Sequence, residues 1–298
     1  MQENRALPLG DWRTAPGLTQ RVFIELVGAM LLVTAIIGSG IAAARLSPGE
    51  VGLQKVETSL VTGVVLVALI LSLQTLAVFN PIVILVQRVA GLIDTNETAV
   101  VIAGQVIGGL LGAVVANLMF GLPALAPATQ TRSGPGLWLG EVLATVGLLV
   151  VLFGVARSGR PDHLGYAVGG YLTAVYWLTG AGSFPNPAVT VARSLSNIDT
   201  GIAPSSAAVL ISMQFVGGVI GYALIRALYS VPLPIEANPA RKADLGEVEL
   251  TDQRRSGMSA PRLRRTMPQA PSGSSAAKKA TWPARLAAVA IGGCRAMT

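Results

Sequence analysis

Residues 184–193 read FPNPAVTVAR, and residues 79–88 read FNPIVILVQR. Both stretches place Asn-Pro at the head of a short apolar run that ends in Arg. Asn is a favourable N-cap because its side-chain carbonyl accepts a backbone N–H of the first helical turn. Pro suits the first helical position, where its missing N–H costs nothing. Asn80-Pro81 and Asn186-Pro187 therefore predict two short helices. One copy would be an ordinary cap, whereas two copies after long apolar segments indicate a shared function.

The composition of the chain is that of an integral membrane protein. Of its 298 residues, 52% are hydrophobic and 12% are charged, whereas a soluble domain usually carries about a quarter charged residues. The net charge is +7. The basic residues lie between apolar segments and near the C-terminus, which favours a membrane topology signal over nucleic-acid binding. With Cys294 and His163 as the single Cys and His, we expect no disulfide, metal site, cofactor or catalysis.

Six apolar segments are long enough to cross a hydrocarbon core of about 30 Å. They cover residues 22–44, 59–79, 99–120, 136–156, 164–180 and 205–229. Two shorter runs, 81–91 and 187–195, start at the Asn-Pro pairs and are too short to span. We expect an N-terminal segment over 1–21, a membrane domain over 22–230, and a basic, disordered tail over 231–298.

The positive charges indicate how the spans are oriented. Six crossings place both termini on one side of the membrane. That side would hold the basic tail and Arg5, Arg13, Arg21, Arg88, Arg157 and Arg160. The other side would hold Arg45, Lys55, Arg132 and Arg193. Because short cytoplasmic segments carry the excess of Lys and Arg, we expect a multi-pass protein of the inner or plasma membrane with both termini in the cytoplasm.

The two halves of the chain resemble each other. IAGQVIGGLLGAVVA at 102–116 aligns with ISMQFVGGVIGYALI at 211–225, and Glu25 aligns with Glu141. Three spans and one short helix give an odd number of crossings, so the second half must be inverted relative to the first. An inverted repeat with two short helices predicts a central site near the bilayer midplane. Small residues spaced by four predict close helix contacts; these are Gly104, Gly108, Gly112, Gly217 and Gly221.

Two short helices that enter from opposite faces would bring their N-termini together near the midplane. Each N-terminus is the positive end of a helix dipole. We expect the pair to repel cations, while the NH₂ groups of Asn80 and Asn186 donate to the oxygen of a neutral solute.

This layout resembles the aquaporin, or major intrinsic protein, family over about residues 20 to 230. Asn186-Pro187-Ala188 matches the family's motif in full, and Asn80-Pro81-Ile82 carries Ile in place of Ala. The resemblance implies an all-α, right-handed bundle of six transmembrane helices with two re-entrant half-helices. It also implies a homotetramer with one pore per subunit. Glu25 and Glu141 would accept backbone N–H bonds from the re-entrant loops.

The same resemblance maps a constriction onto Leu60, Ala174, Ser183 and Val189. Water-selective members have Arg at the position of Val189 and usually His at that of Ala174. Arg193 lies four residues farther on, and we do not expect it to replace that Arg. A filter without a fixed cation should pass larger neutral solutes. The pattern resembles divergent bacterial members associated with arsenic resistance, which implies arsenite, As(OH)₃, as the permeant.

Spacing and chemistry alone support a small neutral hydroxylated solute. A glycerol or water facilitator and a non-conducting membrane scaffold therefore remain open. An ion channel or coupled transporter would require ionisable residues deep within several spans. The spans offer Glu25 and Glu141, and loop support accounts for both. We expect the lipid bilayer and the solute as partners, and no nucleic acid.

Overall fold

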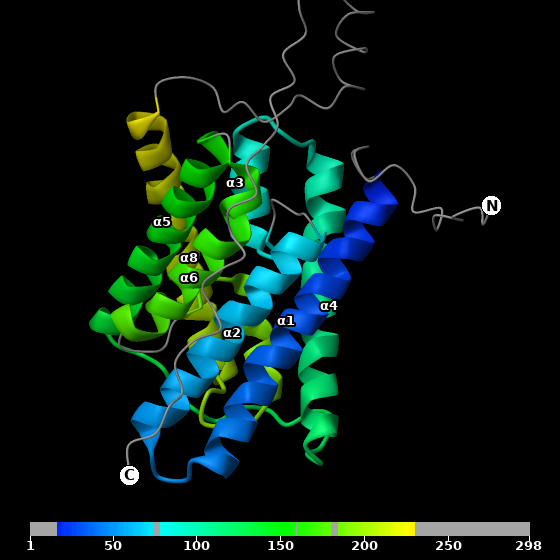
Figure 1. Cartoon of the computed structure of the whole chain (residues 1–298), viewed down its shortest axis with the longest axis vertical. Helices are drawn as coiled ribbons and strands as arrows, with labels where there is room; N and C mark the ends of the chain where they lie inside the picture. The colour runs from blue at the N-terminus through cyan, green and yellow to red at the C-terminus, as the bar shows by residue number, and fades with distance from the viewer. Residues whose placement is uncertain (1–16, 74–77, 159, 180–183, 230–298) are drawn as a thin grey trace, which may run out of the picture. The chain divides into compact units, whose positions relative to one another are not determined.

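The computed structural model describes residues 17–73, 78–158, 160–179 and 184–229. All of these residues belong to one compact unit. Over these ranges the chain forms helices and no strand (Figure 1). The expected tail over 231–298 and most of the expected N-terminal segment lie outside the described residues, as does Ser183.

Five helices are long and apolar enough to cross a membrane. They are α1 (Leu18–Leu46), α2 (Val51–Leu73), α4 (Thr95–Met119), α5 (Pro135–Arg157) and α8 (Pro204–Leu228). Helix α2 begins eight residues before the predicted start of its apolar segment. Its first turns carry polar residues that bond to Ser47: Gln54 Nε2 donates to the Ser47 carbonyl at 2.7 Å, and the Ser47 hydroxyl donates to Glu57 at 2.8 Å. The predicted segment was defined by its apolar residues, so it did not include this polar first part of the helix.

The sixth apolar segment forms a shorter helix than predicted. Helix α6 (Leu164–Leu178) has 15 residues, which corresponds to a rise of about 22 Å at 1.5 Å per residue. A single 3₁₀ turn, η1 (Pro161–His163), precedes it. The expected span continued to residue 180, and residues 180–183 lie outside the described ranges.

Both short helices begin at the predicted prolines. Helix α3 covers Pro81–Val89. Helix α7 covers Pro187–Ala192 and continues into the 3₁₀ turn η2, Arg193–Leu195. The described elements therefore follow the order of two similar halves, in which α1, α2, α3 and α4 correspond to α5, α6, α7 and α8.

Helix pairing follows the same correspondence. Helix α1 packs along α4, as Figure 1 shows, α5 packs along α8, and α2 packs along α6. A side chain at Gly108 would overlap the backbone of α1, and one at Gly217 would lie 2.7 Å from a backbone oxygen of α5. The predicted close contacts of these glycines are thus confirmed. Helices α2 and α6 approach through Gly63 and Gly169, which the internal repeat did not indicate.

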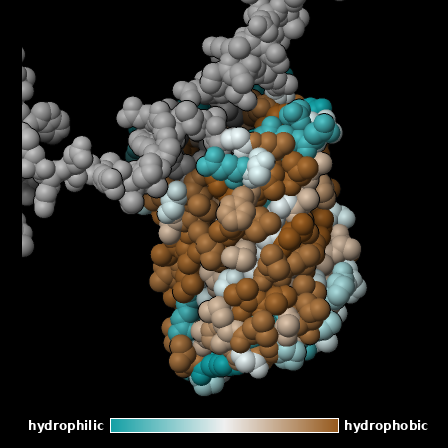
Figure 2. Space-filling view, turned by 90° about the vertical axis from the view of Figure 1, so that its right-hand side faces the viewer, coloured by the Kyte–Doolittle hydropathy of each residue, from teal (hydrophilic) through white to brown (hydrophobic). Residues whose placement is uncertain are grey.

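The outer surface of the helices is apolar. On the face shown in Figure 2, hydrophobic side chains cover most of the surface and hydrophilic ones gather near its two ends. Exposed large apolar residues occur on all five long helices, for example Leu31, Val64, Ile107, Leu143 and Val219. Such a surface suits lipid rather than water. The chain is an all-α, multi-pass membrane protein.

Candidate functional site: the paired half-helices

Each half-helix is capped by its own asparagine. The side-chain oxygen of Asn80 accepts the backbone N–H of Ile82 at 3.0 Å. The side-chain oxygen of Asn186 accepts the N–H of Ala188 at 3.0 Å and that of Val189 at 3.3 Å. Both asparagines are buried. The caps have the geometry that the Asn-Pro pairs predict.

The two asparagines also tie the half-helices to each other. Asn80 Nδ2 donates to the carbonyl of Pro185, and Asn186 Nδ2 donates to the carbonyl of Phe79, both at 2.8 Å. Each amide therefore bonds to the residue that immediately precedes the opposite asparagine, so the two N-termini face each other. An amide NH₂ carries two N–H donors, and this tie uses one of each pair. At most one donor per asparagine is left for a solute, whereas the sequence had suggested a wholly free group.

The loop that leads into α3 has an unusual backbone. Val78 and Phe79 have φ angles of +46° and +58°, a left-handed conformation that costs a non-glycine residue about 1–3 kcal/mol. Glu25 on α1 holds this turn, because its Oε2 accepts the N–H of Phe79 at 3.1 Å. The ring of Phe79 occupies the space beside Gly28, where any side chain would overlap it.

Two buried Glu–Gln pairs support the half-helices at equivalent places of the repeat. Gln105 on α4 donates to Glu25, and Gln214 on α8 donates to Glu141 on α5, each at 2.8 Å. Gln214 also donates to the hydroxyl of Thr190 in α7 at 2.9 Å. The sequence alignment had matched the two glutamines as marks of the repeat without giving them a role. The sequence feature that could have identified this role is a glutamine at the same aligned position of two otherwise apolar segments.

Helix α7 presents different residues to different neighbours. Ala188 and Ala192 face α4, since a side chain at its Gly109 would lie 3.2 Å from the Ala188 carbonyl and 3.5 Å from the Ala192 Cβ. Thr190 faces α8 through its bond with Gln214. Val189 and Arg193 share another face, because the backbone N–H of Arg193 bonds to the Val189 carbonyl one turn back.

The altered residue of the first motif fits against a neighbouring helix. Ile82 is buried, and its Cγ2 lies 3.2 Å from the place that a Cβ at Gly218 of α8 would occupy. The missing side chain at Gly218 thus makes room for the larger Ile82. The substitution is accommodated toward α8.

Leu60 does not lie on the inward face of α2. It is 56% exposed and belongs to an exposed stripe with Val56 and Val64. Thr62, two residues later, is fully buried. Because each residue turns a helix by about 100°, a shift of two residues moves a side chain to the opposite face. The assignment from spacing placed Leu60 at the constriction, whereas the structure leaves Leu60 exposed and buries Thr62 inside the bundle.

The same difference occurs on α6. Ala174 is exposed, as is Trp177 three residues later. Tyr176 is buried, and its hydroxyl lies 3.3 Å from the hydroxyl of Thr62. The inward pair is therefore Thr62 and Tyr176. Of the other predicted constriction residues, Val189 is buried in the same apolar core as Tyr176.

Two arginines lie where α7 ends. Arg193 is 5% exposed, and its Nε donates to the Thr200 carbonyl at 2.7 Å. Arg132, from the loop before α5, donates to the carbonyls on either side, those of Gly201 at 3.0 Å and Asp199 at 2.7 Å. Burial first, and then the charge of Arg193, lower the pKa of Arg132 from its ordinary value to about 10. It therefore stays cationic at neutral pH.

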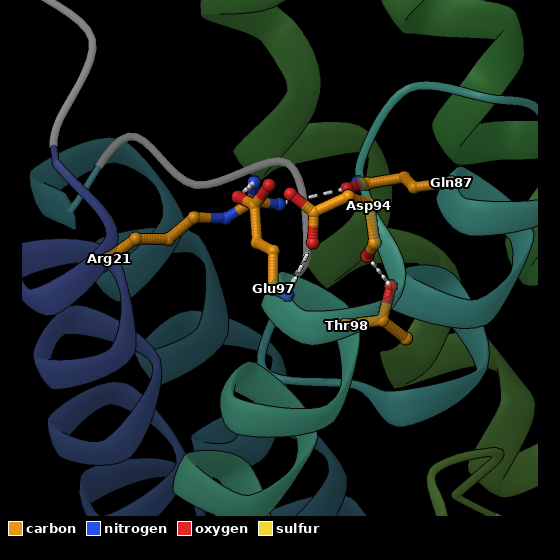
Figure 3. A network of polar contacts seen from close by, with 5 residues as sticks. All are labelled: Arg21, Gln87, Asp94, Glu97 and Thr98. Carbon is orange, nitrogen blue, oxygen red and sulfur yellow. Dashed lines mark hydrogen bonds and ion pairs between the residues drawn. The ribbon is translucent and has the colours of Figure 1, made fainter.

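The opposite end of the bundle carries a paired arginine. Arg21 on α1 forms an ion pair with Glu97 on α4 and donates to Gln87 on α3 at 3.0 Å. Asp94 caps α4, since its carboxylate accepts the Glu97 N–H at 2.7 Å and its carbonyl accepts the Thr98 hydroxyl at 2.6 Å. Figure 3 shows this network, which joins the starts of α1 and α4 to the far end of α3.

The chemistry of this centre is that of hydrogen bonding and dipoles. Within the ranges that the structure describes, no three His, Cys, Asp or Glu side chains are grouped so as to hold a metal ion. The groups that converge are amides, hydroxyls and apolar side chains around two helix N-termini. Such a set can bind and orient a neutral solute.

Comparison with known proteins identifies a similar membrane protein. The chain is 38% identical over 220 residues to aquaglyceroporin AqpS of Rhizobium meliloti (strain 1021). The alignment covers 73% of this chain and 94% of that relative. No protein-family profile matches the chain.

Proposed function

Because the chain belongs to the aquaporin, or major intrinsic protein, family, we propose that it passes small neutral hydroxylated solutes such as glycerol and As(OH)₃ through its own centre. It is a membrane channel and not an enzyme. The observation that carries the proposal is the reciprocal tie of Asn80 and Asn186, each bonded to the loop of the other at 2.8 Å.

The reciprocal hydrogen bonds of Asn80 and Asn186 explain why a neutral solute would pass and a cation would be excluded. They hold the positive ends of α3 and α7 against each other, and helix N-termini disfavour cations. The second N–H of each amide, which the tie does not use, would donate to a hydroxyl oxygen. The proposed supporting role of Glu25 and Glu141 is to hold these N-termini in place, since Glu25 bonds directly to the α3 loop.

We propose that Thr62 and Tyr176 take the places predicted for Leu60 and Ala174 in the constriction, together with Val189. Ser183, which lies outside the described residues, stays a prediction. Thr62 and Tyr176 supply hydroxyl groups, and Val189 supplies an apolar surface with no charge or donor. This combination suits a solute whose oxygens need partners along one side only. As(OH)₃ is uncharged at neutral pH and close to glycerol in shape. The name of the relative supports glycerol, and the resemblance to arsenic-associated members supports As(OH)₃.

Flux into liposomes that contain the purified protein tests the proposal. Wild-type protein should carry glycerol and arsenite well above the background of the lipid. Val189→Arg should narrow the passage and lower both fluxes by at least about tenfold, which an added barrier of about 1.4 kcal/mol produces. Water flux should persist in this variant.

A matched pair of variants tests the corrected constriction. Thr62→Phe should lower glycerol flux, because Thr62 is buried, whereas Leu60→Phe should leave it unchanged, because Leu60 is exposed. Wild-type flux at the lipid background would instead indicate a membrane scaffold. Undiminished arsenite entry in Val189→Arg would show that Val189 does not line the passage.

The assembly and the orientation are proposed on the same basis. We propose a homotetramer with one pore per subunit, which the mass of the detergent-free protein in nanodiscs would test. We also propose that both termini lie in the cytoplasm of a plasma or inner membrane, which the basic residues near the Arg21 end favour. Cys294 is the single cysteine, so its labelling by a membrane-impermeant maleimide in intact cells would contradict this orientation.

A further inference from the structure

A buried guanidinium inside a membrane protein requires an explanation. Arg193 is 5% exposed, and charged side chains within the membrane are energetically expensive and usually functional. Among the residues that the structure describes, no carboxylate lies within ion-pair distance of Arg193. Its side chain bonds to the carbonyl of Thr200, so its positive charge is held in place without being neutralised by a direct partner.

The position of Arg193 on α7 places this charge beside the constriction. Its backbone N–H bonds to the carbonyl of Val189, so the two side chains lie one helical turn apart on the same face. The faces toward α4 and α8 are taken by Ala188 and Thr190. Helices α1 and α3 also contact α7, and Tyr176 on α6 is within electrostatic range of the Arg193 guanidinium.

The charged and titratable groups around Arg193 come from several elements. Tyr176 lies on α6, Glu141 lies on α5, and Arg132 belongs to the loop before α5. Glu141 is engaged by Gln214, and Arg132 adds a second positive charge. Asp199 lies within electrostatic range of Arg132, so two carboxylates face the two arginines at this end, and Arg193 is the cation that shares a face of α7 with Val189.

We propose that Arg193 is a specificity-determining residue of this channel: it supplies, one turn beyond Val189, the fixed positive charge that excludes cations. This inference rests on the proposed function and differs from the expectation from the sequence, in which Arg193 would not replace the missing arginine. Val189 itself adds neither a charge nor a donor to the proposed constriction, so a bulky neutral solute can pass. Arg193 keeps cations out from a position farther along the same face. Selection by size and selection by charge are thus separated onto two residues of α7.

Ion leak and neutral flux, measured on the same liposomes, test this assignment. Arg193→Met keeps the length of the side chain and removes its charge. We expect K⁺ permeability to rise at least about tenfold, equivalent to a barrier lowered by about 1.4 kcal/mol, while glycerol flux is retained. Arg45→Met is the matched control, because Arg45 is an exposed arginine at the same end and contacts Phe120. Its K⁺ permeability should equal that of the wild type.

A relocated charge separates selectivity from structural support. In the double variant Val189→Arg/Arg193→Met, the charge returns one turn inward, and K⁺ permeability should fall back to the wild-type level. Val189→Met/Arg193→Met adds a long side chain without a charge at the same position, so it should keep the K⁺ leak if charge is what excludes K⁺ and lose it if narrowing alone does. Arg193→Gln keeps a donor for the Thr200 carbonyl and should leak K⁺ even if Arg193→Met fails to fold.

The possible outcomes distinguish this inference from the proposed function. If wild-type protein carries glycerol and the folded Arg193→Gln variant carries it without admitting K⁺, the role of Arg193 is overturned and the channel function stands. If wild-type protein carries no glycerol above the lipid background, the proposed function itself fails. A K⁺ leak in Arg193→Gln that the double variant abolishes supports both.

Discussion

The half-helix that begins at Asn80 and the one that begins at Asn186 share a cap but differ in what holds them. At the first, Glu25 bonds directly to the backbone of a left-handed turn at Phe79. At the second, Gln214 reaches the side chain of Thr190 within the helix itself. The first support fixes the loop before the helix, and the second fixes the helix after its cap.

The far ends of the half-helices differ more strongly. At the end of α3, Gln87 accepts a bond from Arg21, whose charge is paired with Glu97. At the end of α7, Arg193 and Arg132 bond to backbone carbonyls of residues 199–201. The two halves of the inverted repeat therefore make matching contacts at the centre, where the half-helices meet. They differ in the charged side chains and their partners at the two ends of the bundle. The proposed selection by charge at Arg193 would therefore belong to the end of the bundle where α7 ends.

The largest expected effect comes from breaking the central tie. Asn186→Ala removes the acceptor of two backbone N–H groups and the donor to Phe79, whereas Asn80→Ala removes the acceptor of one N–H and the donor to Pro185. Since each unsatisfied buried group costs about 1–3 kcal/mol, we expect losses of about 3 kcal/mol for Asn186→Ala and about 2 kcal/mol for Asn80→Ala.

Thermal unfolding in detergent, together with glycerol flux in liposomes, measures this difference. Asn197→Ala is the control, because Asn197 is exposed and bonds to Thr129 in a loop. Equal losses for the two central asparagines would show that the second N–H acceptance at Asn186 adds nothing to the α7 cap.

A smaller effect distinguishes how the half-helices pack on the opposite repeat. A methyl group at Gly109 would lie 3.2 Å from a backbone oxygen of α7, whereas one at Gly218 would lie 3.2 Å from the Ile82 side chain of α3. A side chain can move and a helix backbone cannot. We therefore expect Gly109→Ala to cost about 2 kcal/mol and Gly218→Ala about 1 kcal/mol, as overpacking usually does.

A compensating change sharpens that prediction. Gly218→Ala should cost less in an Ile82→Ala background than in the wild type, because Ile82→Ala removes the side-chain atoms that the new methyl group meets. Unfolding of the single and double variants in the same detergent gives the coupling energy. The absence of any coupling would contradict the packing of Ile82 against α8.

The smallest effect is expected at the end of the bundle where α3 ends and where Arg21 pairs with Glu97. Arg21 and Glu97 are each about a fifth exposed, and partly exposed ion pairs typically contribute about 0.2–1 kcal/mol. Arg21→Met should therefore lower stability slightly, and it should leave K⁺ permeability unchanged, unlike Arg193→Met. A double-mutant cycle with Glu97→Gln, repeated at high salt, measures the pair. A K⁺ leak in Arg21→Met would show that both ends of the bundle select by charge.

Local chemistry is what could be predicted from the sequence. Asn-Pro specifies a capped helix start wherever it occurs, and the apolar segments specify where the chain enters lipid. The glycines spaced by four identified the α1–α4 and α5–α8 contacts because helical periodicity fixes which residues share a face. The prediction was less accurate at the ends of helices. It missed the polar start of α2, and helix α6 is described over 15 residues, fewer than the span expected there.

The tertiary structure decided which side chains face the centre. Counting residues from Asn80 and Asn186 selected Leu60 and Ala174, but two residues of helix correspond to a rotation of about 200°, and Thr62 and Tyr176 face inward instead. Spacing along a chain fixes the rise of a helix and leaves its rotation to packing. The burial of Arg193 arises in the same way, because its surroundings come from α5, α6 and the loop after α7. The sequence by itself determined that two capped half-helices exist, and only their packing determined which side chains are buried around them.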